Sequence, residues 1–527
     1  MKRKLLRVAV GLGSSLVLLG ATTALAGAQD GPPTIESVQE QVTSVAGSTN
    51  LLWIIIGAAL VIFMQAGFAL VETGMCRAKH AAHVVSTNFA IFGLGFIGFF
   101  FVGYGFMFGA QSFAYNIDYD NPIGSWLIGS GESGVLAWAT PALSGKGLSA
   151  GVLGMFLYMV AFMDTTATIP TGSMAERWKW NSFAVWGLFC GAIYYPLFGA
   201  WTWGGGWLSQ LGNSAKLGLG YVDFAGSGVV HAAGGVAALA GALVLGPRIG
   251  KFDKDGKPRS LPGHHLPMAM LGTFILLFGW FGFNAASTFS ASDVRFAVVA
   301  TNTAIAGAFG AIAAMLWSQM KTGKPDPGMM INGMLAGLVA ITAPCAFVSP
   351  WAAAVIGVTG SILVYESIGF FERRGIDDPV GAISVHGVGG IYGVLAVGIF
   401  ANGEYGAGWN LTEAHDGQAA TAGVEGLIKG NFGQFGAQLI GAVVLATVIF
   451  GVAYAFFYFQ NKLTKGGIRS SAADEIAGLD IPEMGVDPYP EFALRDEPVI
   501  ELTDRELVRA AQDSEDEKEL VTIGKHQ

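Results

Sequence analysis

The chain has 527 residues, of which 52% are apolar and only 13% are charged, against roughly 25% charged residues in a soluble domain. This composition excludes an ordinary soluble protein and predicts an all-α polytopic membrane protein. The net charge of −9 is unevenly spread, because residues 471–527 hold sixteen acidic and five basic side chains and contribute −11. The remainder carries −9 minus −11, which is +2, and no nucleic-acid partner is expected.

The first 26 residues have the features of a secretory signal peptide. Basic residues are followed by a short apolar run at 8–19, and Ala24-Leu25-Ala26 fits a small-x-small cleavage site. The alternative is that the run stays uncleaved as a short anchor. Residues 27–49 are polar and are expected to form an external N-terminal segment.

Residues 50–460 contain the predicted membrane domain. Its apolar runs are long enough to span a bilayer, and they lie near residues 51–72, 87–109, 149–173, 182–202, 225–246, 266–284, 294–318, 329–346, 350–371, 380–402 and 434–458. These eleven runs predict eleven transmembrane helices. Residues 461–527 form an acidic C-terminal tail.

Charge in the connecting loops predicts the orientation of these helices. With the mature N-terminus outside, the predicted inner loops carry thirteen Lys and Arg side chains and the outer loops carry four. Cytoplasmic loops are enriched in basic residues. The sequence therefore predicts a multi-pass protein of the cell membrane with an outside N-terminus and a cytoplasmic C-terminus.

An internal repeat connects two distant segments. Residues 223–235 read DFAGSGVVHAAGG and residues 378–390 read DPVGAISVHGVGG, so in each copy an aspartate precedes a histidine by eight residues. The histidines, His231 and His386, fall in the fifth and tenth predicted helices. Because the two sets of five helices start on opposite sides of the membrane, we expect a 5+5 inverted repeat plus one extra helix, with the histidines near its middle.

An ionisable residue inside a membrane helix is a functional-site hypothesis by default. His231 and His386 could share one proton between facing ring nitrogens, or they could be core histidines bonded to backbone carbonyls. No further ligand lies near either histidine, so a metal site is not expected and no metal or other cofactor is predicted. Asp223 and Asp378 stand at helix starts, where a carboxylate caps free N–H groups.

Aromatic residues gather at the predicted outer ends of two helices. One group is Tyr194-Tyr195-Pro196 with the run 201–207, WTWGGGW, and the other is GWFGFNAAS at 279–287, which includes Trp280. They can be read as an interfacial aromatic belt or as a face that attracts a cation. Phe162, on spacing alone, is a core residue.

The remaining histidines and the cysteines suggest structural roles. His80 and His83 fall in a predicted basic inner loop, His264 and His265 in another, His415 in an outer loop and His526 in the tail. The three cysteines have unrelated spacings and are expected to be buried and unpaired.

From about residue 50 to about 490 the chain resembles the Amt/Rh ammonium transporter family, most closely its bacterial Amt members. The resemblance rests on DFAGSGVVHAAGG, WTWGGGWL, GWFGFNAAS, AER at 175–177 and DDPVGAISVHGVGG. It implies an eleven-helix fold, a homotrimer, one hydrophobic pore in each subunit and transport of ammonium or ammonia, with methylammonium as an analogue. It implies no enzymatic activity.

The resemblance also implies roles for individual residues. His231 and His386 match the twin histidines of the pore, and Phe162 and Phe283 match the stacked pair that gates its outer entrance. The outer recruitment site is expected at Trp203 and Ser287, with Asp223 organising it. Further positions around the vestibule and pore are Tyr195, Trp280 and Thr342.

The tail departs from the family pattern. A GLD…EHG segment is usual in the family, but here Gly478-Leu479-Asp480 is followed by Glu483-Met484-Gly485, so a methionine replaces the histidine. A PII-type regulator at the cytoplasmic face is an implied partner that this departure puts in question. A second hypothesis is an ammonium sensor that signals through the tail. A membrane enzyme is a third, but the sequence lacks a nucleophile–base constellation for it.

Overall fold

The computed structural model describes residues 34–490 except 114, 146 and 413–421. Two compact units are distinguished, residues 1–485 and residues 486–527. Every helix and strand named below belongs to the first unit. The predicted signal peptide, His415, His526 and the tail from residue 491 lie outside the described residues.

The eleven predicted spans each have a counterpart in the structure. Within the part of the chain that the structure describes, ten helical segments are long and apolar enough to cross a membrane, and Pro327–Thr342 is a shorter apolar helix between two of them. The α-helices are α2 (Ile35–Met75), α3 (Ala81–Gly98), α4 (Tyr104–Phe108), α5 (Ala150–Ser173), α6 (Trp180–Phe189), α7 (Tyr195–Trp201), α8 (Leu211–Ala215), α9 (Ala233–Leu245), α10 (Leu266–Trp280), α11 (Arg295–Thr322), α12 (Pro327–Thr342), α13 (Pro350–Arg373), α14 (Gly389–Phe400), α15 (Phe432–Val444), α16 (Phe450–Leu463) and α17 (Ala472–Ala477). The prediction of an all-α membrane fold is confirmed.

Several spans are interrupted by a π-helical turn, which widens the helix locally and is frequent at functional sites. These turns are η2 (Phe99–Gly103), η4 (Cys190–Tyr194), η5 (Ser227–Ala232), η6 (Phe281–Ala285), η8 (Ile383–Val388) and η11 (Leu445–Ile449). His231 lies in η5, Phe283 in η6 and His386 in η8. Three of the residues singled out from the sequence therefore stand where a helix departs from regular geometry.

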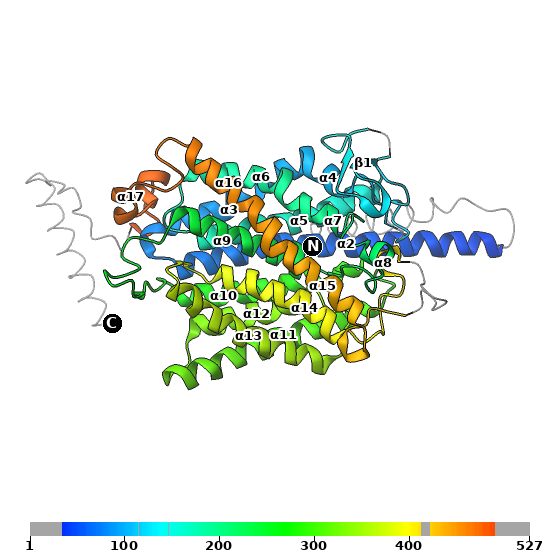
Figure 1. Ribbon diagram of the computed structural model, residues 1–527. Coiled ribbons are helices and arrows are strands. Elements are labelled where there is room, and N and C mark those ends of the chain that lie inside the picture. The colour runs from blue at the N-terminus through cyan, green and yellow to red at the C-terminus, as the bar shows by residue number, and fades with distance from the viewer. Residues whose placement is uncertain (1–33, 114, 146, 413–421, 491–527) are drawn as a thin grey trace, which may run out of the picture. The chain divides into compact units, whose positions relative to one another are not determined.

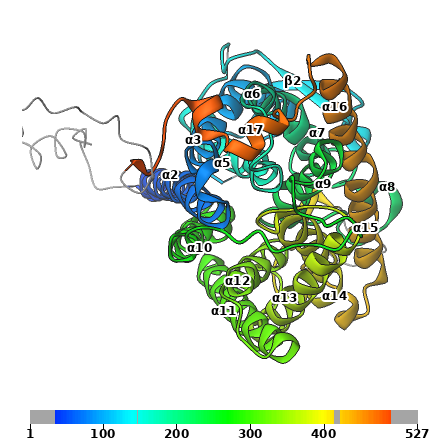
Figure 2. The same ribbon diagram turned by 90° about the vertical axis from the view of Figure 1, so that its left-hand side faces the viewer.

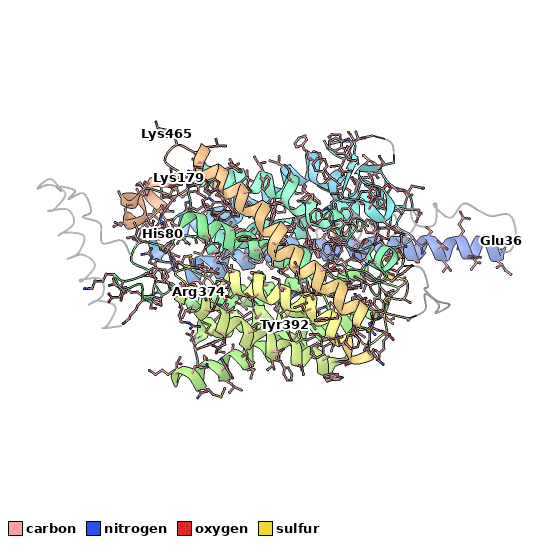
Figure 3. The ribbon with its side chains drawn as sticks, viewed as in Figure 1. Glu36, His80, Lys179, Arg374, Tyr392 and Lys465 are labelled. Atoms are coloured by element: carbon pink, nitrogen blue, oxygen red, sulfur yellow. The ribbon has the colours of Figure 1, made fainter. Side chains whose placement is uncertain are left out.

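Alternate loops gather at opposite ends of the helical unit, as an up-and-down chain requires. At one end, here called the Arg248 end, Arg248 bonds to both Glu176 and Asp377, which belong to other loops. At the opposite, Trp203 end, the Asn50 side-chain amide donates to the Tyr115 carbonyl at 2.8 Å. Figure 1 shows α17 and β1 at these opposite ends. Figure 3 shows His80, Lys179, Arg374 and Lys465 toward the α17 end.

The two halves of the repeat meet along a glycine-rich seam. Seen nearly end-on in Figure 2, α3, α5, α6 and α9 lie in the upper part and α10 to α14 in the lower part, with α15 and α16 along one side. A Cβ added at Gly235 would lie 2.0 Å from the Gly387 nitrogen, and one at Gly390 would lie 2.4 Å from the Ser227 carbonyl oxygen. The Gly-Gly pair of each copy therefore lets the backbone of the other copy approach.

Two further features complete the unit. Helix α2 begins at Ile35 and its first turns project beyond the neighbouring helices at the β1 end (Figure 1). There β1 (Gly124–Ile128) and β2 (Leu136–Ala139) pair antiparallel, with Gly124 opposite Ala139. Large apolar side chains on α10 and α11 are exposed, as expected for lipid-facing helices, and include Phe274, Phe278, Phe309, Ile312 and Leu316.

Candidate functional site

His231 and His386 meet inside the helical unit. Their Nδ1 atoms lie 3.1 Å apart, and the ring planes are inclined by 24°. Both side chains are buried. A hydrogen bond between two ring nitrogens needs one donor and one acceptor, so this distance fits a single proton shared between the rings. The Nδ1 atoms thus pair with each other, as the shared-proton reading predicted.

Sharing that proton fixes the chemistry of the other ring nitrogens. The imidazole that donates from Nδ1 has a bare Nε2, and the imidazole that accepts at Nδ1 carries its proton on Nε2. Nε2 of His231 is buried and has no hydrogen-bond partner among the described residues. The pair can therefore offer one acceptor and one donor to a small guest.

Two aspartates fix the segments that carry the histidines. The Asp223 carboxylate accepts N–H groups of Gly226, Gly228 and Val229 at 2.8 to 2.9 Å. Asp378 does the same at the other copy, accepting from Gly381 at 3.0 Å and Ile383 at 2.7 Å. The predicted capping role of both aspartates is confirmed, because free N–H groups at a helix start favour an adjacent carboxylate.

A stack of aromatic rings continues from His231 toward the Trp203 end. Phe283 lies 5.3 Å from the His231 ring, and Phe162 stacks on Phe283 at 4.0 Å with planes inclined by 21°. Both phenylalanines are buried. Trp280 also stacks against His231, with ring centres 5.2 Å apart, and its Nε1 donates to Thr342 Oγ1 at 2.8 Å. Spacing alone predicts that Phe162 is a core residue, and it does not predict this stack.

Beyond the stacked phenylalanines, polar atoms appear again. Trp203 is half-buried, lies 5.9 Å from Phe162, and donates from Nε1 to the Asp223 carbonyl at 2.7 Å. Ser287 Oγ donates to the Phe283 carbonyl at 2.7 Å and lies 3.0 Å from the Tyr158 hydroxyl. An indole face and two hydroxyls thus stand beside the ring stack, a combination that can attract a small cation.

The predicted site residues are not all equally close to this path. Trp280 lies against His231 and Thr342 bonds to Trp280, whereas Tyr195 is buried against Phe99, with ring centres 5.9 Å apart. Tyr158, which sequence reasoning did not single out, packs against Phe162 with ring centres 4.7 Å apart and planes inclined by 35°. It stands four residues before Phe162, one helical turn away, which is the signal that could have found it.

At the Arg248 end, buried charges tie the loops together. The Arg248 guanidinium donates to Asp377 Oδ2 at 2.8 Å, to Asp377 Oδ1 at 3.0 Å and to Glu176 Oε1 at 2.9 Å. Burial raises the pKa of the Asp377 carboxyl, but Arg177 and Arg248 outweigh it and hold that pKa well below its usual value. At Glu176, burial also raises the carboxyl pKa, but Arg248, His80 and Arg77 outweigh it, so that pKa is lowered.

The C-terminal segment 464–485 packs on the same end. The backbone N–H of His83 donates to Asp480 Oδ1 at 2.8 Å, and that of Leu479 donates to His80 Nδ1 at 3.2 Å. Glu483 accepts from the Trp180 N–H at 2.7 Å. The prediction of a loop position is wrong for His83, which lies in α3, whereas His80 stands in the short 3-10 turn Ala78–His80 that connects α2 and α3. Both histidines are buried.

Comparison with known proteins agrees with this geometry. Residues 52–489 match the family model described as Ammonium Transporter Family. The chain belongs to this family. It is 45% identical over 445 residues to the ammonium transporter Amt2 of Archaeoglobus fulgidus, which covers 84% of this chain and 88% of that protein. It is 35% identical to Amt1 of Haloferax mediterranei, over 85% of this chain and 80% of the relative.

Solved structures give the same assignment. A protein described as Sensor Amt Protein superposes with a TM-score of 0.71 at 33% identity, covering 83% of this chain and 99% of the other. The crystal structure of Candida albicans Mep2 gives 0.65 at 25% identity, covering 81% and 87%. The chain is therefore a multi-pass membrane protein of the ammonium transporter family, a transporter and not an enzyme.

Proposed function

We propose that each subunit passes ammonium or ammonia along the path described above. Trp203 and Ser287, with the segment fixed by Asp223, recruit the cation. Phe162 and Phe283 gate the entrance and exclude water, and His231 and His386 accept and donate hydrogen bonds to the guest in transit. The observation that carries the proposal is the 3.1 Å Nδ1 contact directly behind the stacked phenylalanines.

The proposed path selects against potassium by chemistry and not by size. Transferring a monovalent ion into a dry, low-dielectric passage costs on the order of 20 kcal/mol in the idealised limit. Potassium channels offset this cost with rings of carbonyls, and the path here is lined by aromatic and imidazole rings instead. Ammonium can give up a proton and pass as ammonia, whereas potassium cannot.

Uptake of labelled methylammonium by vesicles tests this path. His231→Ala removes one partner of the shared proton and Phe162→Ala opens the ring stack, so we expect uptake to fall in the first variant and selectivity over potassium to fall in the second. Leu316→Ala, at an exposed position of α11, is the control. If both variants kept wild-type rates of uptake and wild-type selectivity, the proposed pore would be ruled out.

The form in which the substrate crosses is decided by current measurement. If a proton accompanies each ammonia, saturating ammonium evokes a current across a reconstituted membrane. If ammonia crosses alone, uptake proceeds without current. In both cases the histidine pair provides the hydrogen-bonding site, so His231→Ala is expected to lower uptake.

The remaining assignments concern the assembly and its surroundings. We place the protein in the cell membrane with the Trp203 end outside, and propose a homotrimer, as the family resemblance implies. Native mass spectrometry of the detergent-solubilised protein is expected to give three times the 55.0 kDa chain mass, less any removed signal peptide. A PII-type regulator at the Arg248 end remains a candidate partner, to be tested by binding to inverted vesicles.

Ammonium sensing is the second candidate function. It is favoured by the similarity to the protein described as Sensor Amt Protein and by the C-terminal segment, which packs on the Arg248 end. The test is truncation after Gly485, which keeps every contact of that segment named above. Unchanged uptake together with loss of a cellular nitrogen response would support sensing, and an intact response would oppose signalling through residues 486–527.

A further inference from the structure

A small cavity lies on the far side of the histidine pair, toward the Arg248 end. Its volume is about 20 Å³, which is enough for one water-sized molecule. His386 and Glu72 both line it, with Asn332 as a further polar residue. The other lining residues are apolar: Phe68, Val71, Ile169, Leu276, Leu335, Val380, Ala382 and Val385.

Glu72 is an unusual residue at this position. It belongs to the apolar helix α2 and only 3% of its surface is exposed. Among the described residues, no Lys, Arg or His nitrogen forms an ion pair with it; its hydrogen-bond partners are Asn88 Nδ2 at 2.6 Å from Oε2 and the Thr171 hydroxyl at 2.9 and 2.8 Å from the two oxygens. A buried carboxylate without a cation is costly, so an ionisable residue within a membrane helix marks an ion or proton path by default.

The hydrogen bonds of Glu72 leave acceptor capacity free. A carboxylate offers about four lone-pair positions. Asn88, Thr171 and the Gly172 N–H fill at most three of them, and the single Thr171 proton also lies 2.6 Å from the Thr168 carbonyl. The neighbouring carboxylate, Asp378, is different, because the N–H groups of Gly381 and Ile383 occupy its oxygens. Glu72 therefore keeps acceptor capacity beside the cavity.

We propose that Glu72 forms an inner binding site for ammonium, reached after the substrate passes His386. An ammonium ion is about the size of a water molecule and carries four N–H donors. Those donors suit the Glu72 carboxylate and the Asn332 side-chain oxygen. The site stabilises the charged form of the substrate at the inner end of the path, as Trp203 and Ser287 do at the outer end. This inference rests on the proposed function and adds a third substrate-binding site to the proposed path.

The test is Glu72→Gln in proteoliposomes. Glutamine keeps the size of the side chain and a carbonyl oxygen for Asn88 and Thr171, but removes the charge. We expect ammonium uptake to fall about tenfold or more, the loss that corresponds to removing a charged hydrogen bond. Glu366→Gln is the matched control, because Glu366 is a largely exposed carboxyl on α13 that does not line the cavity.

A direct binding measurement separates a binding role from a structural one. Infrared difference spectra are recorded on the wild-type protein when ammonium chloride replaces sodium chloride at constant ionic strength. We expect a carboxylate band that shifts with ammonium, that disappears in Glu72→Gln, and that persists in Glu366→Gln. Thermal unfolding of each variant in detergent shows that it is folded.

The outcomes are distinct. An inactive but folded wild-type protein would overturn the proposed function and the inner site with it. A second outcome is that the wild type is active and Glu72→Gln keeps wild-type uptake and an unchanged infrared difference. This result would overturn the inner site alone and would assign the cavity to a structural water. Reduced uptake with no ammonium-sensitive Glu72 band would also overturn it, since Glu72 would then be structural.

Discussion

At the scale of single residues, the path depends on groups that are held in one orientation. The two imidazoles can offer a donor and an acceptor only because each sits on a segment capped by an aspartate. Asp223 has a second task, since its backbone carbonyl accepts the Trp203 indole N–H at 2.7 Å. One aspartate therefore positions both the histidine and the aromatic residue at the entrance, and its partner Asp378 positions only a histidine.

This difference predicts unequal effects for two chemically identical substitutions. Asp223→Asn and Asp378→Asn each replace a carboxylate that accepts several N–H groups, so each is expected to lower the free energy of unfolding by about 1–3 kcal/mol. Asp223→Asn should also disturb Trp203 and reduce methylammonium uptake more strongly. Thermal unfolding in detergent and vesicle uptake measure the two effects. A larger uptake loss in Asp378→Asn would contradict this account of Trp203.

At the scale of elements, the internal repeat was the feature that could be predicted from the sequence. The spacing of aspartate, histidine and paired glycines is local, and the structure brings its two copies together as the inverted repeat predicts. The start of the second span could not be predicted from the sequence. Residues 78–86 include Lys79, His80 and His83, and the partners of the two histidines come from residues 479–480, about four hundred positions later.

Glu72 and Tyr158 were missed for a different reason. Each is a single residue in a long apolar helix, without a repeated partner to draw attention to it. The rule that singled out the histidines, an ionisable side chain within a membrane helix, applies equally to Glu72. What the sequence could not supply is the position of Glu72 beside the same cavity as His386, because α2 and η8 are adjacent only in the folded protein.

The loop cluster at the Arg248 end predicts a large loss of stability. Arg248→Met leaves Asp377 and Glu176 buried with fewer partners, and breaking a buried ion pair costs about 3–5 kcal/mol. Lys321→Met is the control, because its pair with Glu366 is largely exposed and such pairs contribute about 0–1 kcal/mol. Chemical or thermal unfolding at pH 7 measures both. Equal effects would show that the cluster does not hold the loops.

The same cluster predicts how stability changes with pH. The pKa values of Asp377 and Glu176 lie below their usual values in the folded protein. Their stabilisation is therefore complete above the unfolded pKa of about 4 and is lost as the pH falls through the lower, folded values. The unfolding temperature of the wild type should fall on acidification below about pH 4, and Arg248→Met should show a weaker fall. An identical acid dependence would contradict this assignment.

At the scale of the whole molecule, the path has a direction only if the two ends face different compartments. The structure places Arg77, Arg177 and Arg248 together at one end, where the alternation of spans also brings the C-terminal segment. The excess of basic residues in these loops favours the cytoplasm for that end. The recruitment residues at the Trp203 end would then meet external ammonium before the stacked phenylalanines.

Cysteine labelling can test this orientation without removing any native cysteine, because Cys76, Cys190 and Cys345 are all buried and unpaired. We expect Ser214→Cys, exposed at the Trp203 end, to react with a membrane-impermeant maleimide added outside intact cells. Lys254→Cys, exposed in the loop after α9, should react only after the membrane is permeabilised. The unsubstituted protein is the control for background labelling. The reverse pattern would invert the transporter and place the recruitment site in the cytoplasm, so that Glu72 and its cavity, and not Trp203, would be the first station for external ammonium.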